Sequence, residues 1–243
     1  MRLTHSTDGA TEMAITIDQW ELAEKCVGNL RRVLLYGPPG TGKTYAAMHY
    51  NLTPDQPMYT NTLTEETPAS ELRGHYIMTE GSYKWMHGPA IRSWLDGARY
   101  VLNELDRASG DCHSICYAIL DDQPSAQLTL PNGETVKPQP STNFVITMNG
   151  NESDLPEALI DRMDAIIKIT RPHPAALEAL PEDLRKIADE ATSSENPRTR
   201  TSVRKWFAFA DARSKMDVVS ACVAVFGERA QDIINAYELQ SRL

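Results

Sequence analysis

A glycine-rich stretch in the first fifth of the chain has the spacing of a phosphate-binding loop. Residues 37–44 read Gly-Pro-Pro-Gly-Thr-Gly-Lys-Thr and fit G-x-x-x-x-G-K-[S/T]. The glycines let successive backbone N–H groups converge on phosphate oxygens, and the start of the following helix adds positive potential. Lys43 supplies a cation for the β- and γ-phosphates, and the Thr44 hydroxyl is placed to bind Mg²⁺. The expected nucleotide contacts are Gly37, Pro38, Pro39, Gly40, Thr41, Gly42, Lys43, Thr44 and Tyr45.

A second polar group follows an apolar strand pattern that ends at Asn103 and Glu104. A carboxylate at such a strand tip can orient a water against the γ-phosphate, and Glu104 is the best placed. Asn103 stands where an Asp usually holds the hydration shell of Mg²⁺. An amide can accept a hydrogen bond from a metal-bound water but adds no charge. We therefore predict Glu104 as catalytic and Asn103 as a weak metal contact; the alternative is a strand end with surface acids.

Asn149 and Arg162 complete the predicted catalytic set. Asn149 follows the fourth strand pattern, where its amide can hold the attacking water together with Glu104. Residues 155–162 read as a short helix with Pro156 near its start and Arg162 at its end. An arginine there can point into the active site of a neighbouring subunit and stabilise charge on the transferring phosphoryl group. The alternative for Arg162 is an i, i+4 ion pair on its own helix.

Two arginines, Arg198 and Arg200, precede a helical pattern that begins at Thr201. An arginine at this helix start can reach back to the γ-phosphate and report the nucleotide state. Arg200 is the preferred candidate, Arg198 stays open, and solvation of both is the alternative.

The elements that must position these residues alternate along the chain. Strand patterns at residues 33–36, 57–63, 99–103, 143–148 and 165–170 are separated by helical patterns that include 18–30 and 43–50. Such alternation predicts an α/β fold of the P-loop NTPase type, a parallel five-stranded sheet with helices on both faces. Two hairpin patterns interrupt it, at 75–86 and at 127–137. Residues 175–192, 201–213, 217–226 and 228–239 read as helices, which predicts a small all-helical lid.

The expected domain boundaries follow from these patterns. They are a flexible N-terminus at 1–12, a core at 13–171 with inserts at about 73–88 and 127–137, and the lid at 172–243.

Composition narrows the function classes. The formal net charge of −9 disfavours tight nonspecific binding to nucleic acid, which needs a basic surface. No apolar run approaches the roughly 18–20 residues that span a bilayer, and the first twelve residues lack the apolar region of a signal peptide. We therefore expect no membrane association and a cytoplasmic location. Cys112 and Cys116 could share a helical face, but without a second ligand pair nearby reduced thiols are the favoured interpretation.

The motifs occur in the order found in AAA+ ATPases. Over about residues 15–215 the chain resembles the MoxR-like and dynein-related branch. Residues 37–44 resemble Walker A, 101–104 Walker B, 71–89 the helix-2 insert and 128–136 the pre-sensor hairpin. The resemblance implies that Asn149 is sensor 1, Arg162 the arginine finger and Arg200 sensor 2. Asn103 departs from the family pattern.

The same resemblance implies a function. It implies ATP as the nucleotide, Mg²⁺ as the metal, and a ring, commonly hexameric, that holds nucleotide between subunits. It further implies ATP-driven remodelling, of chaperone type, of a protein client, often alongside a partner with a von Willebrand factor A domain. One alternative is a nucleotide-gated assembly or binding module with weak hydrolysis. A nucleic-acid-linked motor that uses GTP ranks last, because no Asn-Lys-x-Asp guanine signal occurs.

Overall fold

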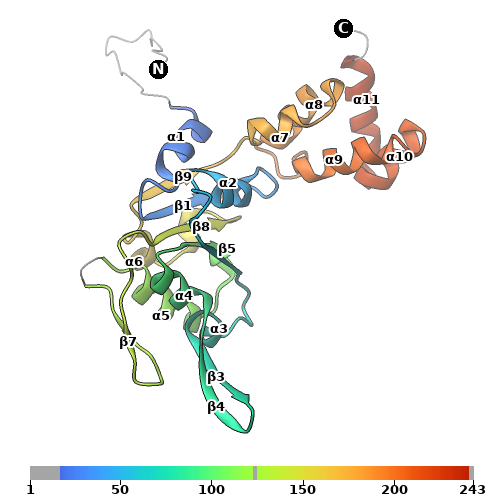
Figure 1. Ribbon diagram of the computed structural model, residues 1–243. Helices are drawn as coiled ribbons and strands as arrows, with labels where there is room; N and C mark the ends of the chain where they lie inside the picture. Colours follow the sequence, from blue (N-terminus) through green and yellow to red (C-terminus); the bar gives the residue numbers. More distant parts are fainter. Residues whose placement is uncertain (1–16, 123–124, 241–243) are drawn as a thin grey trace, which may run out of the picture. The chain divides into compact units, whose positions relative to one another are not determined.

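The computed structural model describes residues 17–122 and 125–240 (Figure 1). The chain forms two compact units. Among the described residues, the first contains 17–36, 44–122 and 125–168, and the second contains 37–43 and 169–240. The segment 1–12, expected to be flexible, lies outside the described residues.

The first unit is built on a five-stranded sheet in the order β2-β5-β8-β1-β9, with all pairs parallel. The parallel five-stranded sheet expected from the sequence is therefore confirmed. Its strands are β1 (Arg32–Tyr36), β2 (Met58–Thr62), β5 (Arg99–Asn103), β8 (Asn143–Met148) and β9 (Ala165–Lys168).

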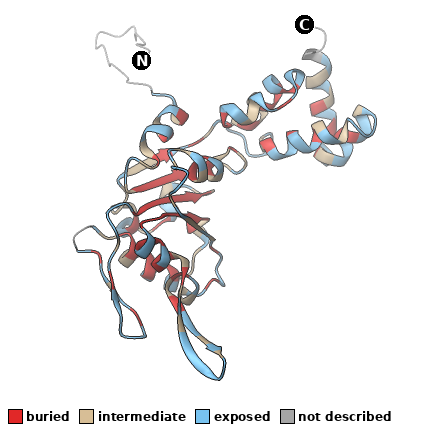
Figure 2. Cartoon of the chain, in the orientation of Figure 1, coloured by how far each residue is buried: buried red, intermediate tan, exposed pale blue. Residues whose placement is uncertain are grey.

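Both faces of this sheet are covered. Strand side chains alternate between the faces, and on one face Leu34, Leu102 and Ile146 pack in a cluster with Trp94 and Ile115. The residues between them, such as Val33 and Val145, are also fully buried, so the central strands are red along most of their length in Figure 2. The helices of this unit are α1 (Gln19–Cys26), α2 (Lys43–His49), α3 (Ala69–Arg73), α4 (Pro89–Asp96), α5 (Gly110–Ile119) and α6 (Glu157–Ile160), with 3₁₀ turns η1 (Leu105–Arg107) and η2 (Glu152–Asp154).

Local signals set the helix ends. Asp18 accepts from the backbone of Trp20 at 2.8 Å and caps α1, as Ser109 caps α5. Helix α1 ends at Cys26, short of the 18–30 expected from the sequence, because Val27 is extended. Gly97 ends α4 in the left-handed conformation.

Both expected hairpins are present. β3 (Gly74–Thr79) pairs with β4 (Ser82–His87), and the two residues between them, Glu80 and Gly81, both have positive φ, as a tight hairpin turn requires. β6 (Leu128–Thr129) and β7 (Thr135–Val136) are shorter than expected. The His87 Nε2 lies 2.9 Å from Glu134 Oε2, which links the first hairpin to the turn of the second.

The second unit is helical apart from its segment 37–43, and the helical C-terminal region is confirmed. Its helices are α7 (Pro174–Glu178), α8 (Glu182–Ser193), α9 (Val203–Ala212), α10 (Val218–Phe226) and α11 (Ala230–Gln240), with η3 (Gly227–Arg229). Trp206, Phe209 and Phe226 pack in its core with their rings edge-on or tilted to one another. The helix expected at 175–192 is two helices, because Pro181 cannot continue the hydrogen-bond ladder. Within the described residues, no helix is long and apolar enough to cross a bilayer.

Candidate functional site

The phosphate loop has the backbone that its glycines were expected to provide. Gly37, Gly40 and Gly42 have φ values of 131°, 76° and 110°. A Cβ at Gly37 would lie 2.2 Å from the carbonyl oxygen of Ile169, so only glycine fits. The Lys43 ammonium donates to the carbonyls of Gly37 at 2.8 Å and Pro38 at 2.7 Å, and Lys43 is 5% exposed. The loop therefore holds a buried cation over a tightly turned backbone.

The same loop is bonded to other segments of its own unit, the second. The Thr41 carbonyl accepts from the His173 N–H at 2.7 Å, and the Gly40 carbonyl accepts from the Val203 N–H at 3.3 Å. Val203 is the first residue of α9. The start of α9, which follows the candidate sensor arginines Arg198 and Arg200 in the chain, therefore contacts the phosphate loop within the second unit.

Thr44 and Asn103 meet in the first unit. The Thr44 hydroxyl donates to Asn103 Oδ1 at 3.1 Å, and the Thr147 hydroxyl donates to the same oxygen at 2.9 Å. The Asn103 amide nitrogen faces the Asn61 carbonyl at 3.4 Å. The sequence analysis did not include Thr147 and Asn61 in the site. Their position as polar residues near the end of a strand pattern could have indicated it.

Glu104 and Asn149 also come together. The Asn149 amide donates to Glu104 Oε1 at 2.5 Å. Glu104 has φ 60° and ψ 42°, a left-handed conformation that few non-glycine residues adopt. Such backbone strain, of about 1–3 kcal/mol, tends to occur at functional sites. A second neighbour, Arg107, was not foreseen: its Nε lies 2.9 Å from Glu104 Oε2.

Arg162 contacts its own chain. Its guanidinium donates to the carbonyls of Ala158 at 2.7 Å and Tyr117 at 3.2 Å, and it lies over the Tyr117 ring. Asp121 is 4.0 Å away. The expected helix around it is only the one turn of α6. The arginine is thus held by neutral carbonyls and one distant acid.

The two candidate sensor arginines differ in environment. Arg200 Nε donates to the Ser194 carbonyl at 2.7 Å, whereas Arg198 is exposed. Arg229 donates to the Arg200 carbonyl at 2.9 Å and to the Thr201 hydroxyl at 2.5 Å, which fixes the backbone of this segment. The geometry leaves both arginines as candidates.

Arg99 is a buried cation that sequence reasoning did not single out. It is fully buried and donates to the carbonyls of Ala47 at 3.2 Å, Tyr50 at 2.7 Å and Asn51 at 3.3 Å, and to Asn143 Oδ1 at 3.0 Å. These carbonyls lie at and just beyond the C-terminal end of α2, where a cation is favourable. Burial lowers the pKa of Arg99 to about 10, so it stays charged at neutral pH. In the sequence, the feature that could have indicated this role is a charged residue at the start of an apolar strand.

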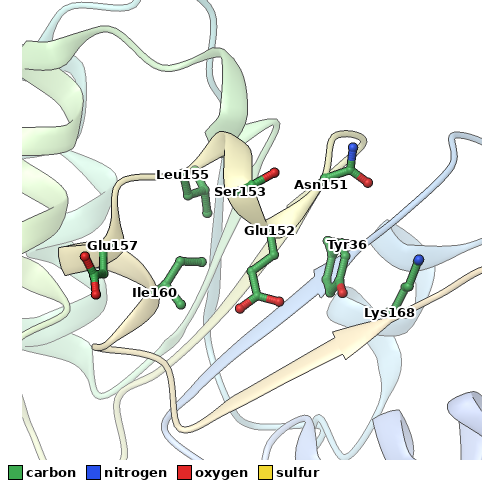
Figure 3. A pocket seen from close by; sticks show the side chains of 8 residues that line it. All are labelled: Tyr36, Asn151, Glu152, Ser153, Leu155, Glu157, Ile160 and Lys168. Atoms are coloured by element: carbon green, nitrogen blue, oxygen red, sulfur yellow. The ribbon is translucent and has the colours of Figure 1, made fainter.

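A groove of about 580 Å³ opens beside the ends of β1 and β9 (Figure 3). Leu155 and Ile160 supply apolar lining, while Glu152, Glu157 and Lys168 supply charge. Burial, together with the charge of Glu152, raises the pKa of Tyr36 in its wall. None of the expected catalytic residues lines this groove.

The cysteines do not form a metal site among the described residues. All four are free, and Cys112 and Cys116 are buried. Burial raises the pKa of the Cys116 thiol to about 12, so it is neutral at physiological pH and poorly suited to bind a metal.

Comparison with known proteins agrees with these motifs. A family model described as "AAA domain (dynein-related subfamily)" matches residues 32–163, more than half of the chain. The chain belongs to this family. It carries an ATPase domain of the AAA type, and the resemblance to the MoxR-like and dynein-related branch is confirmed.

Several curated relatives resemble this AAA domain. Protein NorQ of Paracoccus denitrificans is 28% identical over 185 residues, which cover 76% of this chain and 66% of NorQ. Denitrification regulatory protein NirQ of Pseudomonas aeruginosa is 28% identical, covering 52% of this chain and 48% of NirQ. Protein CbbQ of Hydrogenophilus thermoluteolus is 26% identical, covering 54% and 49%. The matched region spans about half to two thirds of the length of these relatives.

A solved structure shares the fold. NtrX from Brucella abortus, crystallised with ADP, superposes with a TM-score of 0.55 at 16% identity, covering 80% of this chain and 47% of NtrX. At this identity the likeness supports the fold alone.

Proposed function

We propose that the protein is a Mg²⁺-dependent ATPase of the MoxR-like type, which assembles into a ring, commonly hexameric, and remodels a protein client. The observation that carries the proposal is the Glu104–Asn149 pair at 2.5 Å, placed on a strained backbone directly after β5. Asn103, which precedes Glu104, contacts Thr44, and Thr44 follows the phosphate-loop lysine in the chain. One short strand end therefore carries both the base and a contact to the nucleotide-binding segment.

The proposed roles follow from these groups. Backbone N–H groups of the loop and Lys43 bind the phosphates. Glu104 accepts a proton from the attacking water, while the Asn149 amide fixes the carboxylate and the water. Charge then accumulates on the phosphoryl oxygens, where cationic side chains stabilise it. Arg200, with Arg198 as the alternative, is the proposed sensor of the γ-phosphate.

Thr44 and Asn103 fit a Mg²⁺ ion. Mg²⁺ binds hydroxyl, amide and water oxygens, and the Thr44 hydroxyl donates its hydrogen to Asn103, so its lone pairs stay available for a cation. Asn103 Oδ1 already accepts from Thr44 and Thr147, so it can accept from a metal-bound water in place of one of them, and it contributes no negative charge. When bound, the ion neutralises charge that develops between the β- and γ-phosphates.

Ring assembly is proposed because Arg162 needs a neighbouring active site to act upon. Within its own chain it is held mainly by two carbonyls and the face of Tyr117, contacts that an anionic phosphate can replace. Native mass with and without ATP tests this: we expect a ring with ATP. A monomer under both conditions would leave Arg162 without a role in trans.

The β3–β4 hairpin is the proposed client-binding element, and a partner with a von Willebrand factor A domain fits the same family role. Met78 and Tyr83 are opposite one another on one face and are 71% and 74% exposed. Exposed apolar groups of this kind mark interaction sites. The double variant Met78→Ser/Tyr83→Ser should lower the fluorescence of a hydrophobic dye, whereas Lys84→Ser on the opposite face should not. Equal fluorescence in the double variant would contradict the proposal.

A cytoplasmic location is part of the proposal. The four cysteines are free, as is usual in a reducing compartment, and ATP is the proposed substrate.

The variant Glu104→Gln tests the assigned base. It keeps the shape and the contact with Asn149 but removes the basic oxygen, so hydrolysis should be abolished while ATP affinity is retained. Glu65→Gln, at an exposed glutamate in a loop, is the matched control and should hydrolyse ATP at the wild-type rate. Persistent turnover in Glu104→Gln would remove Glu104 from this role.

A second candidate is a nucleotide-gated binding module with weak hydrolysis. It is favoured by one observation: the group that faces Thr44 is the neutral amide of Asn103. Single-turnover hydrolysis by wild type and by Asn103→Asp separates the candidates. A large rise in rate when the acid is restored favours the binding module, and an efficient wild-type enzyme excludes it.

A further inference from the structure

The two carboxylate oxygens of Glu104 have different surroundings. Oε1 accepts from the Asn149 amide at 2.5 Å. Oε2 lies 2.9 Å from Arg107 Nε, exposes less than 1 Å² of surface and has no aligned hydrogen bond among the described residues. The contact with Arg107 is therefore an ion pair that covers Oε2 without saturating it.

The local backbone creates this contact. Glu104 is left-handed and caps the 3₁₀ turn η1, whose last residue is Arg107. The Arg107 N–H donates to the Glu104 carbonyl at 2.9 Å. In a 3₁₀ turn, side chains three positions apart lie above one another. The left-handed conformation of Glu104 thus places its carboxylate next to the Arg107 guanidinium.

A general base must offer a lone pair to the water it activates, within about 3 Å. In this conformation the Asn149 amide takes one lone pair of Oε1, and the Arg107 guanidinium covers Oε2. We propose that Arg107 is a positioning residue that covers Glu104 in the resting subunit, and that hydrolysis requires the guanidinium to move away. This inference rests on the proposed role of Glu104 as the base.

The exposed fractions of the two side chains support the proposal that Arg107 covers Glu104 reversibly. The Arg107 side chain is 64% exposed and that of Glu104 is 26% exposed. Within the described part of the chain, Glu104 is the ionic partner of Arg107, so the arginine can rotate into solvent without breaking a second ion pair. Glu104 stays fixed by Asn149 meanwhile. Uncovering the base needs a side-chain rotation and no rearrangement of the sheet.

Single-turnover hydrolysis with the full chain in excess over MgATP tests the proposal. Arg107→Ala should raise the rate constant by about two- to fivefold, the range for an exposed ion pair. Arg107→Lys should stay near the wild-type rate, because it keeps the charge. Rates of Arg107→Ala at or below wild type, with ATP affinity and melting temperature unchanged, would overturn the proposal.

Salt supplies a readout that a purely structural role would not move. Raising NaCl to about 0.5 M screens exposed pairs, so the wild-type rate should approach that of Arg107→Ala, whose own rate should change less. If Arg107→Ala does not fold, Arg107→Gln takes its place, and parallel salt responses in wild type and variant would still refute the idea. Glu104→Gln separates the two levels. ATP hydrolysis by Glu104→Gln would refute the proposed function. If Glu104→Gln does not hydrolyse ATP and Arg107→Ala hydrolyses it at the wild-type rate, only this inference is refuted.

Discussion

The hydroxyl of Thr44 donates to the amide oxygen of Asn103 across 3.1 Å. This contact explains how an asparagine can stand where an aspartate is usual. An amide oxygen accepts from Thr44 as a carboxylate oxygen would, and its nitrogen faces the Asn61 carbonyl. An aspartate would instead direct an oxygen at that carbonyl. The asparagine suits this strand end, at the cost of one negative charge beside the proposed metal.

Asn149→Ala should slow hydrolysis without weakening ATP binding. The variant removes the donor that fixes Glu104 Oε1, so both carboxylate and water lose their orientation. We expect the single-turnover rate to fall about a hundredfold. An ATP titration with a fluorescent analogue serves as the internal control. A rate within a factor of about two of wild type would exclude Asn149 from the chemistry.

Lys43→Ala should weaken nucleotide binding itself. A charged hydrogen bond contributes about 1.5–3 kcal/mol, which corresponds to an affinity loss of roughly 10- to 100-fold. Equilibrium titration with ATP measures it, and Lys137→Ala, at an exposed lysine in the second hairpin, is the control. Full affinity in Lys43→Ala would contradict the assignment of the phosphate loop.

Arg99→Met should destabilise the first unit strongly. It removes the donor from the carbonyl of Ala47, where the contact is buried, and from those of Tyr50 and Asn51, where it is partly buried, and we expect a loss of about 1–3 kcal/mol in the free energy of unfolding. Arg99→Lys keeps the charge but has fewer hydrogen-bond donors, so its free energy of unfolding should lie between those of wild type and Arg99→Met. Urea unfolding measures all three proteins. A stable Arg99→Met protein would show that water replaces the guanidinium.

Asp183 should give the helical unit a pH-dependent contribution to stability. Hydrogen bonds from Arg213 and Tyr237 lower its pKa below the ordinary value of 3.8. A carboxylate with a lowered folded-state pKa stabilises the protein above its unfolded-state pKa, and this contribution is lost as pH falls through the folded-state value. The Asp183 side chain is 47% exposed, so the pair contributes only about 1 kcal/mol.

Asp183→Asn tests this contribution. At neutral pH the melting temperature should fall by about 2–4 °C relative to wild type, and the difference should shrink below about pH 4. Glu190→Gln, at an exposed acid of the same helix, should melt like wild type. A difference that persists at low pH would assign the effect to packing.

Much of the sheet was predictable because its signals are local. Residues 99–103 and 143–148 were expected as strands and are strands, since each is an apolar run bounded by polar residues. The phosphate loop was equally clear from its glycines. The single helix expected at 175–192 was wrong because Pro181 outweighs the helical pattern around it. The end of α1 also differed, and Val27, buried and extended there, shows tertiary packing overriding propensity.

The site was harder to predict where it depends on contacts between distant segments. Glu104 and Asn149 were chosen from strand ends, and the parallel sheet brings them together. Arg99 and Thr147 were missed because their partners lie 44 or more residues away in the chain. Arg107 was missed for another reason: the sequence does not show the left-handed backbone of Glu104 and the 3₁₀ turn that follows it, which place the two side chains next to each other.

Strand β5 is hydrogen-bonded to helix α2 at both ends of the helix. Asn103 bonds to Thr44 near the start of α2, and Arg99 bonds to the carbonyls just after the end of α2. Helix α2 and strand β5 are therefore coupled mechanically. A displacement of α2 near Thr44 is expected to reach the start of β5 at Arg99. These hydrogen bonds oppose sliding or rotation of α2 relative to β5. Amide hydrogen exchange in α2 and β5 should accordingly slow in concert when ATP engages.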